Sequence, residues 1–273
     1  MTSTHAATLR ALHRPGDPLL LPNVWDAASA GAVHAAGFPA VATSSAAIAE
    51  SLGYADGEGA PVEEMLDAIA RIVAAVPLPV TADLERGYGM PPAELVERLA
   101  ATGAAGCNLE DSDPRTGVLT EAAEQADWLA AIRTAAGAAR VPLVINARVD
   151  TYVRPTAHGE ARGGSGASGD LGEADLGGIV GETVRRARAY LAAGADCVYP
   201  ILAADPGEIR AIVHGAGGPV NILFTPRTPS LARLADTGVA RVSFGAGLYR
   251  AAYASFTTAL TALAARRDPY AGR

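Results

Sequence analysis

The stretch ATGAAGCNLED at residues 101–111 carries the pattern that decides the fold. It ends a helix-like segment, places Gly103 where helices commonly stop in a left-handed turn, and continues as a short apolar run that ends in acids. The same order recurs in AAGFPAVATS (35–44), AAGADCVYP (192–200) and DTGVARVSFG (236–245). The repeated order predicts helices that alternate with buried strands.

Eight apolar runs of this kind occur along the 273 residues, each followed by an Ala/Leu-rich segment with helical spacing. Regular alternation of strands and helices predicts right-handed βαβ units in a parallel sheet, and eight units close most naturally into a (β/α)₈ TIM barrel. A doubly wound sheet is the alternative, but the first strand–helix turn, PNVWDAAS (22–29), has no Gly-rich phosphate loop. The predicted strands are 19–25, 40–44, 79–84, 106–111, 142–150, 197–202, 219–224 and 241–245, and the predicted helices are 26–36, 62–76, 92–102, 120–138, 180–193, 205–213, 229–237 and 246–266.

Two segments lie outside this alternation. Residues 1–14 predict an extra N-terminal amphipathic helix, and residues 155–178 are rich in Gly, Ser and charge. We interpret 155–178 as a flexible insertion after strand five within a single 1–273 barrel domain. It follows a strand end where barrel active sites lie, so a lid and a solvated insertion both stay open.

Composition narrows the class of partners. The formal net charge is −7, lysine is absent and no arginine run stands out, which disfavours a nucleic-acid surface. No apolar run approaches the roughly 18 residues of a membrane span, and no signal peptide is recognisable. The two cysteines, Cys107 and Cys197, lie far apart in apolar segments, which disfavours a disulfide. We expect a cytoplasmic protein that binds neither nucleic acid nor membranes.

Polar side chains end three consecutive predicted strands. In a TIM barrel the carboxyl ends of the strands form the active site, and residues i and i+2 of a strand share a face. The polar side chains at the ends of three neighbouring strands are therefore predicted to point toward the same place. They are Asp83 and Glu85 from strand three, Asn108 and Glu110 from strand four, and Asn146, Arg148 and Asp150 from strand five.

Carboxylates gathered this closely repel one another unless a positive charge neutralises them. A hard divalent cation such as Mg²⁺ would do so, and Arg148 would then be free to grip a substrate carboxylate or phosphonate. The alternative is that the acids are ordinary strand-end charges paired with Arg86, Arg115 or Arg148. Their coincidence at three neighbouring strand ends favours the metal.

Other candidates rest on weaker patterns. Asp56 lies in the Gly-rich segment SLGYADGEG (51–59), where it would close over a ligand or simply serve a turn. Ser44 and Ser45 end strand two, where backbone N–H groups at a helix start would bind an oxyanion. Trp25 ends strand one. The histidines do not fall at the expected strand ends, which disfavours zinc.

Five segments together resemble the isocitrate lyase/phosphoenolpyruvate mutase superfamily: LPNVWDAASA (21–30), TSSAAIAESLGYADGE (43–58), ADLERGYG (82–89), NLEDS (108–112) and INARVDTY (145–152). The resemblance continues in order to RVSFGAGLYRAAYA (241–254) and so covers nearly the whole chain.

The resemblance implies a barrel that exchanges its last helix with a neighbour, in a homotetramer built from helix-swapped dimers. It implies Mg²⁺ or Mn²⁺, bound mostly through water, and an enolate formed from a 2-oxo acid. By position, Asp83, Glu85 and Glu110 match the metal-binding acids, Asp56 the mobile-loop acid and Arg148 the substrate-binding arginine. The substrate-binding set is Trp25, Ser44, Ser45, Ala46, Arg148 and Asn221.

Departures from the family pattern bear on the reaction. The lyases carry a Lys-Arg-Cys-Gly-His loop after strand four, whereas EDSDPRTGVLTEA (110–122) has no Lys, Cys or His there. Arg115 is the only cation in that segment, so it joins Asp56 and Arg148 as a catalytic candidate. Glu85-Arg86 stands where the best-studied members have Asp-Thr, and Ile201 stands near where lyases use Glu.

The resulting expectation is a Mg²⁺-dependent lyase. It would cleave a C–C bond of a 2-oxo or 2-hydroxy di- or tricarboxylic acid, by retro-aldol cleavage or decarboxylation, through a metal-stabilised enolate. The alternatives are a C–P bond enzyme and a non-catalytic protein that binds 2-oxo acids.

Overall fold

The computed structural model describes residues 2–154 and 178–271, so the predicted insertion 155–178 lies outside the described residues except for Gly178. All strand pairs in it are parallel. The strands are β1 (Leu19–Leu21), β2 (Asn23–Val24), β3 (Val41–Thr43), β4 (Val80–Asp83), β5 (Gly106–Glu110), β6 (Val144–Val149), β7 (Cys197–Pro200), β8 (Asn221–Leu223) and β9 (Arg241–Ser243). Each predicted strand is present, and the first is split at Pro22, which has no N–H to donate to a ladder.

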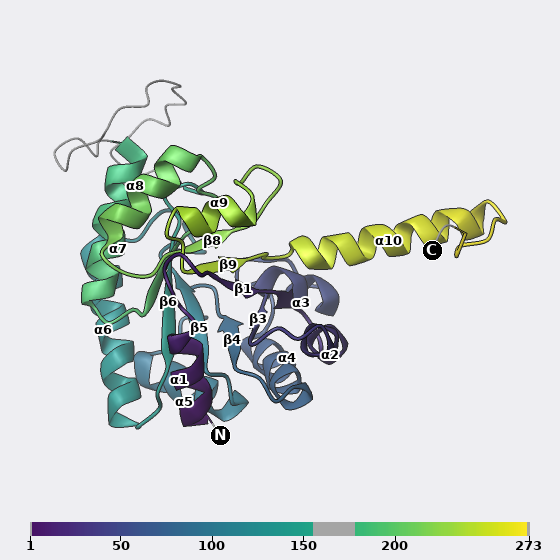
Figure 1. Cartoon of the computed structure of the whole chain (residues 1–273). Helices are drawn as coiled ribbons and strands as arrows, with labels where there is room; N and C mark the ends of the chain where they lie inside the picture. The colour runs from purple at the N-terminus through teal and green to yellow at the C-terminus, as the bar shows by residue number, and fades with distance from the viewer. Residues whose placement is uncertain (1, 155–177, 272–273) are drawn as a thin grey trace.

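Helices surround the strands on the outside (Figure 1). They are α1 (Thr2–Ala11), α2 (Ala27–Ala35), α3 (Ser45–Leu52), α4 (Val62–Ala75), α5 (Pro92–Thr102), α6 (Ala122–Ala138), α7 (Gly178–Ala192), α8 (Pro206–Ala216), α9 (Leu231–Asp236) and α10 (Gly247–Ala264). The predicted N-terminal helix is confirmed as α1. The α/β class with a parallel sheet is confirmed as well.

The strands form two ladders that together make the barrel. One has the order β2-β3-β4-β5-β6-β7, and the other has the order β1-β9-β8. The chain itself joins β1 to β2 across Pro22, and a single parallel bridge between Val198 and Val220 joins β7 to the start of β8. The ring therefore closes across two places where the ladder is thin.

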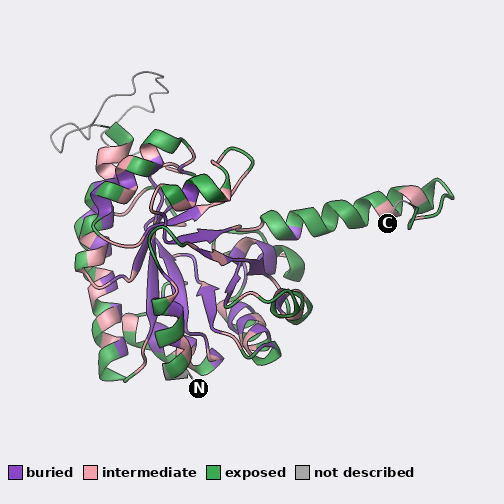
Figure 2. Cartoon of the chain, viewed as in Figure 1, coloured by how far each residue is buried: buried purple, intermediate pink, exposed green. Residues whose placement is uncertain are grey.

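Two apolar clusters fill the molecule, and Figure 2 shows the buried strands at its centre. The larger lies between the sheet and the outer helices and includes Met65, Ile69 and Leu129. The smaller lies inside the barrel beneath α1 and includes Leu9, Leu21 and Val144. Gly106 permits this close approach, because a Cβ there would lie 2.6 Å from the carbonyl oxygen of Val144 and 3.2 Å from a methyl group of Leu9.

Helix α3 was not among the predicted helices, because one helix was expected after each strand and the next was placed at 62–76. The structure has both α3 and α4 after β3. Ser44 caps the start of α3 by accepting a hydrogen bond from the Ala47 N–H, and Gly53 ends it in a left-handed conformation, with φ of 89°. The extra helix places Ser45 and Ala46 in a first turn beside β4.

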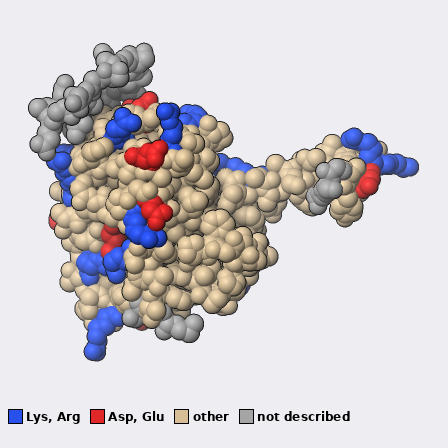
Figure 3. Space-filling view, in the orientation of Figure 1, with Lys and Arg blue, Asp and Glu red and all other residues tan. Residues whose placement is uncertain are grey.

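Helix α10 extends away from the barrel (Figure 1). Its surface is largely uncharged, and Arg and Asp appear in the segment that follows it (Figure 3). Phe256 is 56% exposed and Leu263 is 54% exposed, and Tyr253 and Leu260 are exposed with them. Side chains of this size seldom gather in solvent without a partner. No helix within the described ranges is long and apolar enough to cross a membrane.

Candidate active site

The register of β4, β5 and β6 sets the polar groups at the carboxyl end of the barrel. Asp83 pairs with Asn108, Asn108 pairs with Asn146, and Glu110 pairs with Arg148. Residues paired in neighbouring parallel strands lie side by side, and those on the inner face point into the barrel. The predicted convergence of these strand ends is therefore present in the structure.

The N-terminus of α3 holds the Asp83 carboxylate. One oxygen accepts hydrogen bonds from the Ser45 N–H at 3.0 Å and the Ser45 hydroxyl at 2.8 Å. The other faces the Asn108 amide, whose Nδ2 lies 3.4 Å away. A helix N-terminus attracts negative charge, so the first turn of α3 fixes the position of this carboxylate.

Glu85 reaches the same cluster from a different backbone conformation than the one predicted. Strand β4 ends at Asp83, and Glu85 lies in a left-handed turn with φ of 50°, so the i, i+2 strand rule does not place it. Its two carboxylate oxygens accept hydrogen bonds from the Tyr88 hydroxyl and the Glu58 N–H, both at 2.6 Å. Burial raises the pKa of Glu85 to about 7; the Tyr88 hydrogen bond opposes this, and nearby Asp56 and Asp83 add to it.

Glu58 joins two loops at the rim of the site. Besides donating to Glu85, it accepts a hydrogen bond from the Tyr88 N–H at 2.6 Å. Glu58, Glu85 and Tyr88 all have positive φ, which costs free energy for side chains other than glycine. The strained α3–α4 loop and the strained β4–α5 loop therefore brace one another. Sequence reasoning missed Glu58, because no spacing rule connects residue 58 with residues 85 and 88.

Arg148 lies between two acids. Its Nη1 is 2.5 Å from a carboxylate oxygen of Glu110, and its Nε and Nη2 donate to Asp150 at 2.6 and 3.1 Å. Burial raises the pKa of Glu110 well above its usual range, and the neighbouring Arg148 charge opposes that rise. Arg148 is also buried, but Asp150 and Glu110 keep its pKa above the ordinary value.

A buried network outside the barrel lumen supports Asp150. The Ser112 hydroxyl donates to the Asp150 carboxylate. The Asp150 N–H donates to one carboxylate oxygen of Asp111 at 2.8 Å. The other oxygen of Asp111 accepts from Arg186 at 3.0 Å and from the Tyr190 hydroxyl at 2.7 Å. Because each member is paired, this network fixes Arg148 from behind.

Asp56 lies at the exposed rim, yet it approaches the cluster. Partial burial raises its pKa, Asp83 raises it further, and a hydrogen bond from the Gly57 N–H and the Arg148 charge oppose the rise. The predicted residues that the structure brings together are therefore Ser45, Asp56, Asp83, Glu85, Glu110 and Arg148.

The comparisons with known proteins are consistent with this arrangement. The family model for phosphoenolpyruvate phosphomutase matches residues 9–264. The chain belongs to this family. It is 36% identical to the Mycobacterium tuberculosis protein Rv1998c over 267 residues, covering 95% of this chain and 92% of that protein.

Solved structures of the same superfamily overlay closely. A candidate phosphonomutase from Burkholderia cenocepacia J2315 has a TM-score of 0.83 and 40% identity, covering 96% of this chain and 99% of that one. A 2,3-dimethylmalate lyase has a TM-score of 0.80 and 25% identity, covering 98% and 87%. These neighbours confirm the TIM barrel, and the superfamily contains both lyases and phosphonomutases. Its members are enzymes of C–C or C–P bond chemistry that typically use a divalent metal.

Other predicted site residues of this superfamily member lie outside the cluster. The Arg115 side chain is 88% exposed and pairs with Asp113 at 3.4 Å. Trp25 packs edge-on against Tyr249 of α10, with ring centroids 5.1 Å apart. Asn221 lies deeper in the barrel, where its amide donates to the Ser243 hydroxyl at 3.1 Å.

Arg86, which was offered as a pairing partner for the acids, turns away from them. Its guanidinium lies 4.7 Å from the ring centre of Trp128 and donates to Gln125. Of Arg86, Arg115 and Arg148, only Arg148 forms an ion pair with the acids at the strand ends. Cys107 and Cys197 are buried and unpaired, as expected.

The acids of the cluster fit a cation held through water better than one held directly. Within residues 2–154 and 178–271, no three His, Cys, Asp or Glu side chains converge closely enough to hold a metal ion. Each acid has a protein partner: Ser45 donates to Asp83, Tyr88 and Glu58 donate to Glu85, and Arg148 pairs with Glu110. An all-oxygen donor set beyond direct reach suits Mg²⁺, which keeps several of its waters.

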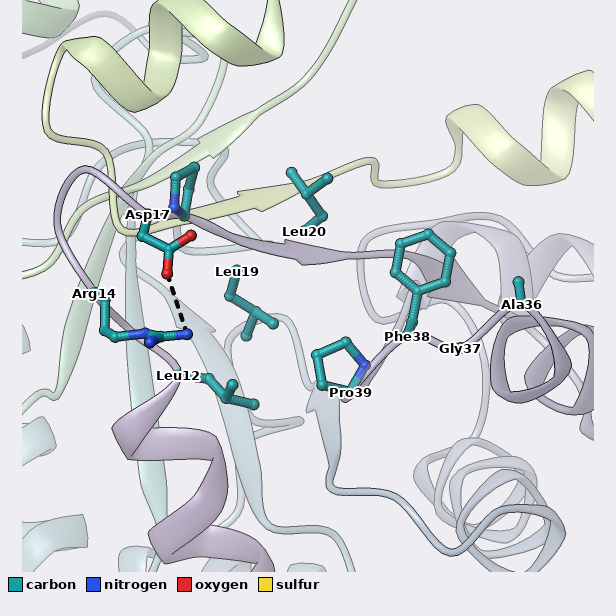
Figure 4. Close-up of a pocket in the computed structure, with 10 residues that line it drawn as sticks. Leu12, Arg14, Asp17, Leu19, Leu20, Ala36, Gly37, Phe38 and Pro39 are labelled. Carbon is teal, nitrogen blue, oxygen red and sulfur yellow. Dashed lines mark ion pairs between the residues drawn. The ribbon is translucent and has the colours of Figure 1, made fainter.

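A separate pocket of about 320 Å³ lies at the amino ends of the strands, between the end of α1 and the α2–β3 loop (Figure 4). It is lined by Leu12, Leu19, Phe38 and Pro39 and crossed by an ion pair between Arg14 and Asp17 at 3.1 Å. The acids of the candidate site lie at the other end of the strands, so this pocket is not part of that site.

Proposed function

We propose that this protein is a Mg²⁺- or Mn²⁺-dependent lyase that cleaves a C–C bond of a 2-oxo or 2-hydroxy di- or tricarboxylic acid. The observation that carries the proposal is the cluster of Asp83, Glu85 and Glu110 beside Arg148 at the carboxyl end of the barrel. Burial and neighbouring acids raise the pKa values of Glu85 and Glu110, and a bound cation would relieve that repulsion. Likeness to a lyase of a substituted malate supports the substrate class.

Substrate binding would fall to Arg148 and the first turn of α3. Three of the five N–H groups of Arg148 are used by Asp150 and Glu110, which leaves two for a substrate carboxylate. Ala46 lies in the first turn of α3, where backbone N–H groups have no partner within the helix. A carboxylate between Ala46 and Arg148 would be held from both sides.

The proton steps would involve Asp56. When bound, the divalent ion supplies positive charge to the oxygen of the developing enolate. Asp56 lies at the open rim and close enough to Asp83 and Arg148 to feel their charges, so its carboxylate is placed to accept a hydroxyl proton from an arriving substrate. Arg115 would need a movement of the loop that bears it, because its side chain lies in solvent.

A direct assay tests the proposal. The purified chain is incubated with Mg²⁺ and a panel of oxaloacetate-like and substituted malate-type acids, and release of pyruvate or 2-oxoglutarate is measured. Turnover that is abolished by EDTA and by Glu110→Gln, but retained in Asp67→Asn on the exposed face of α4, supports the lyase. Binding of 2-oxo acids with no turnover across the panel contradicts it and favours a non-catalytic binding protein.

A C–P bond enzyme is the second candidate. It is favoured by the match to the phosphoenolpyruvate phosphomutase family and by the 40% identity to a candidate phosphonomutase. The test is phosphonopyruvate as substrate, with phosphate or phosphoenolpyruvate as product. Turnover of phosphonopyruvate and of none of the carboxylic acids would replace the first proposal by this one.

We also propose that the chain assembles as a homotetramer of helix-swapped dimers. The support is α10, which extends from the barrel with Tyr253, Phe256, Leu260 and Leu263 exposed. Burying such a face removes apolar surface from water, and a second copy of the chain offers an equivalent helix and barrel.

A further inference from the structure

Arg241 is a charged residue in the interior of the barrel. It occupies the first position of β9 and is completely buried. Its Nη2 donates to the Asn108 Oδ1 at 3.1 Å, and its Nε and Nη1 make no hydrogen bond within the described part of the chain. No ion pair joins it to a described carboxylate, in contrast to Arg148 and Arg186. A buried guanidinium in this setting costs free energy of folding, so it calls for a role other than stability.

The residue that Arg241 contacts is itself tied to the candidate site. Asn108 Oδ1 accepts from both Arg241 and the Asn146 Nδ2, the latter at 2.9 Å. An oxygen that receives two donors fixes the orientation of its amide, because the NH₂ end could not accept them. The Nδ2 of Asn108 consequently faces Asp83, at 3.4 Å from its Oδ1.

Several buried polar groups lie in the barrel interior with Arg241. Thr81 Oγ1, Asn146 Oδ1 and Asn221 Oδ1 are buried and make no hydrogen bond within the described residues. Asn221 is the register partner of Arg241 on the neighbouring strand. Buried polar atoms of this kind are commonly served by internal water.

We propose that Arg241 is a positioning residue: acting through Asn108, it holds the Asp83 carboxylate in the orientation that the divalent cation requires. The inference rests on the proposed metal site at Asp83. The link runs from β9 across the barrel to β5 and then to β4, so it joins the three-stranded ladder to the six-stranded one.

A structural role and a positioning role predict opposite results for Arg241→Met. If the guanidinium served packing alone, its removal would lower stability and leave cation binding unchanged. If it serves positioning, an apolar side chain of similar length would keep the melting temperature or raise it, because replacing a buried charge by a hydrophobic group is commonly neutral or stabilising. Cation affinity would fall at the same time.

Mn²⁺ binding measures the effect without relying on turnover. The full chain is titrated with Mn²⁺, and binding is followed by electron paramagnetic resonance. The dissociation constant of Arg241→Met is expected to be 10- to 100-fold larger than that of wild type, which is the typical loss when a residue that orients a metal ligand is removed. Arg241→Lys keeps a positively charged donor but not the planar, two-pronged donor geometry of the guanidinium, so it is expected to lose less Mn²⁺ affinity than Arg241→Met. Arg188→Met, which removes an exposed arginine bonded to the Gly215 carbonyl, is the control for loss of a guanidinium away from the site and is expected to bind as wild type does.

A double-mutant cycle tests whether Arg241 acts through Asn108. If it does, Arg241→Met combined with Asn108→Leu binds Mn²⁺ no more weakly than Asn108→Leu alone. Additive losses would overturn the proposed path. Unchanged Mn²⁺ affinity in both folded Arg241 variants would overturn the proposal itself, and Arg241→Lys decides it if Arg241→Met does not fold. If wild type binds no Mn²⁺, the proposed metal function fails, which is a separate result.

Discussion

The guanidinium of Arg148 lies 2.5 Å from a carboxylate oxygen of Glu110, which is its register partner on the neighbouring strand. Asp150, two residues farther along the chain, takes two further donors of the same guanidinium. One cation therefore neutralises two buried acids. Removing one member of a buried group of charges leaves the others uncompensated, whereas a surface pair has little to lose.

Arg148→Met is expected to lower the free energy of unfolding by about 3–5 kcal/mol, because Glu110 and Asp150 would remain buried without their cation. Arg98→Met is the control, since Arg98 pairs with the exposed acids Glu63 and Glu94, and it should cost about 1 kcal/mol or less. Urea denaturation of both variants gives the comparison. Equal losses of unfolding free energy in the two variants would show that Arg148 does not neutralise both Glu110 and Asp150.

Divalent-metal binding is expected to strengthen as pH rises through about 7. Glu85 has its pKa raised to about 7 in the metal-free chain, so below that pH the cation must displace a proton. Mn²⁺ titrations from pH 5.5 to 8.5 measure this. An affinity that stays flat across the range would remove Glu85 from the metal-binding set.

Tyr88→Phe refines the same experiment. The Tyr88 hydroxyl donates to Glu85 and so stabilises the ionised carboxylate. Without it, the Glu85 pKa rises further and the midpoint of the pH dependence moves to higher pH. Tyr54→Phe is the matched control, because the Tyr54 hydroxyl donates to Glu64 at the surface. A shift toward lower pH in Tyr88→Phe would contradict the assignment.

His13 is expected to make the chain sensitive to mild acid. Burial and the Arg241 charge lower its pKa from 6.5 to about 4. A histidine that is buried neutral contributes its full stability above about pH 6.5 and loses it as pH falls toward 4, a loss of about 3 kcal/mol.

Unfolding free energies of wild type and His13→Leu, measured between pH 7 and pH 4, test this. The difference between the two should shrink as the pH falls. His214→Leu is the control, because the two rings share one hydrogen-bond pattern: each Nδ1 lies 2.7 Å from the carbonyl four residues earlier, but His214 is exposed. A pH-independent difference for His13→Leu would refute the buried neutral state.

Disrupting the exposed face of α10 is expected to break the assembly. Wild type should migrate in light-scattering chromatography as a multiple of its 27.6 kDa chain mass. Phe256→Asp and Leu260→Asp place a charge on the apolar face and should yield smaller species. Thr258→Asp, on the opposite side of the helix, should not. A monomeric wild type would end the proposal of a helix-swapped tetramer.

Most of the architecture could be predicted because its signals are local. Helix, glycine and buried strand follow one another within about ten residues, and the repeats of that order specify a parallel barrel. Helix α3 was missed because it breaks the rule of one helix per strand. The β1–β2 break was missed for a simpler reason: Pro22 lies inside an apolar run that otherwise looks continuous.

The candidate site was partly predictable. The strand-end rule found Asp83, Glu110 and Arg148, and their register is the one it requires. The rule also named Glu85, but it assumed that Glu85 extends the strand, whereas Glu85 lies in a left-handed turn. Glu58 depends on contacts between two loops, which no spacing reveals. Arg241 did carry a signal, since an arginine that begins the apolar run RVSF of a central strand has no solvent to reach.

The two thin places in the barrel wall have a mechanical consequence. Between β1 and β2 the ladder stops at Pro22, and between β7 and β8 it is reduced to the Val198–Val220 bridge. We therefore expect the wall to act as two panels that meet at these two places, which we call hinges. Asp83, Glu110 and Arg148 all belong to one panel and keep their mutual spacing, while Arg241 and Asn221 belong to the other. Amide hydrogen exchange should begin along the hinges and reach the acidic panel last.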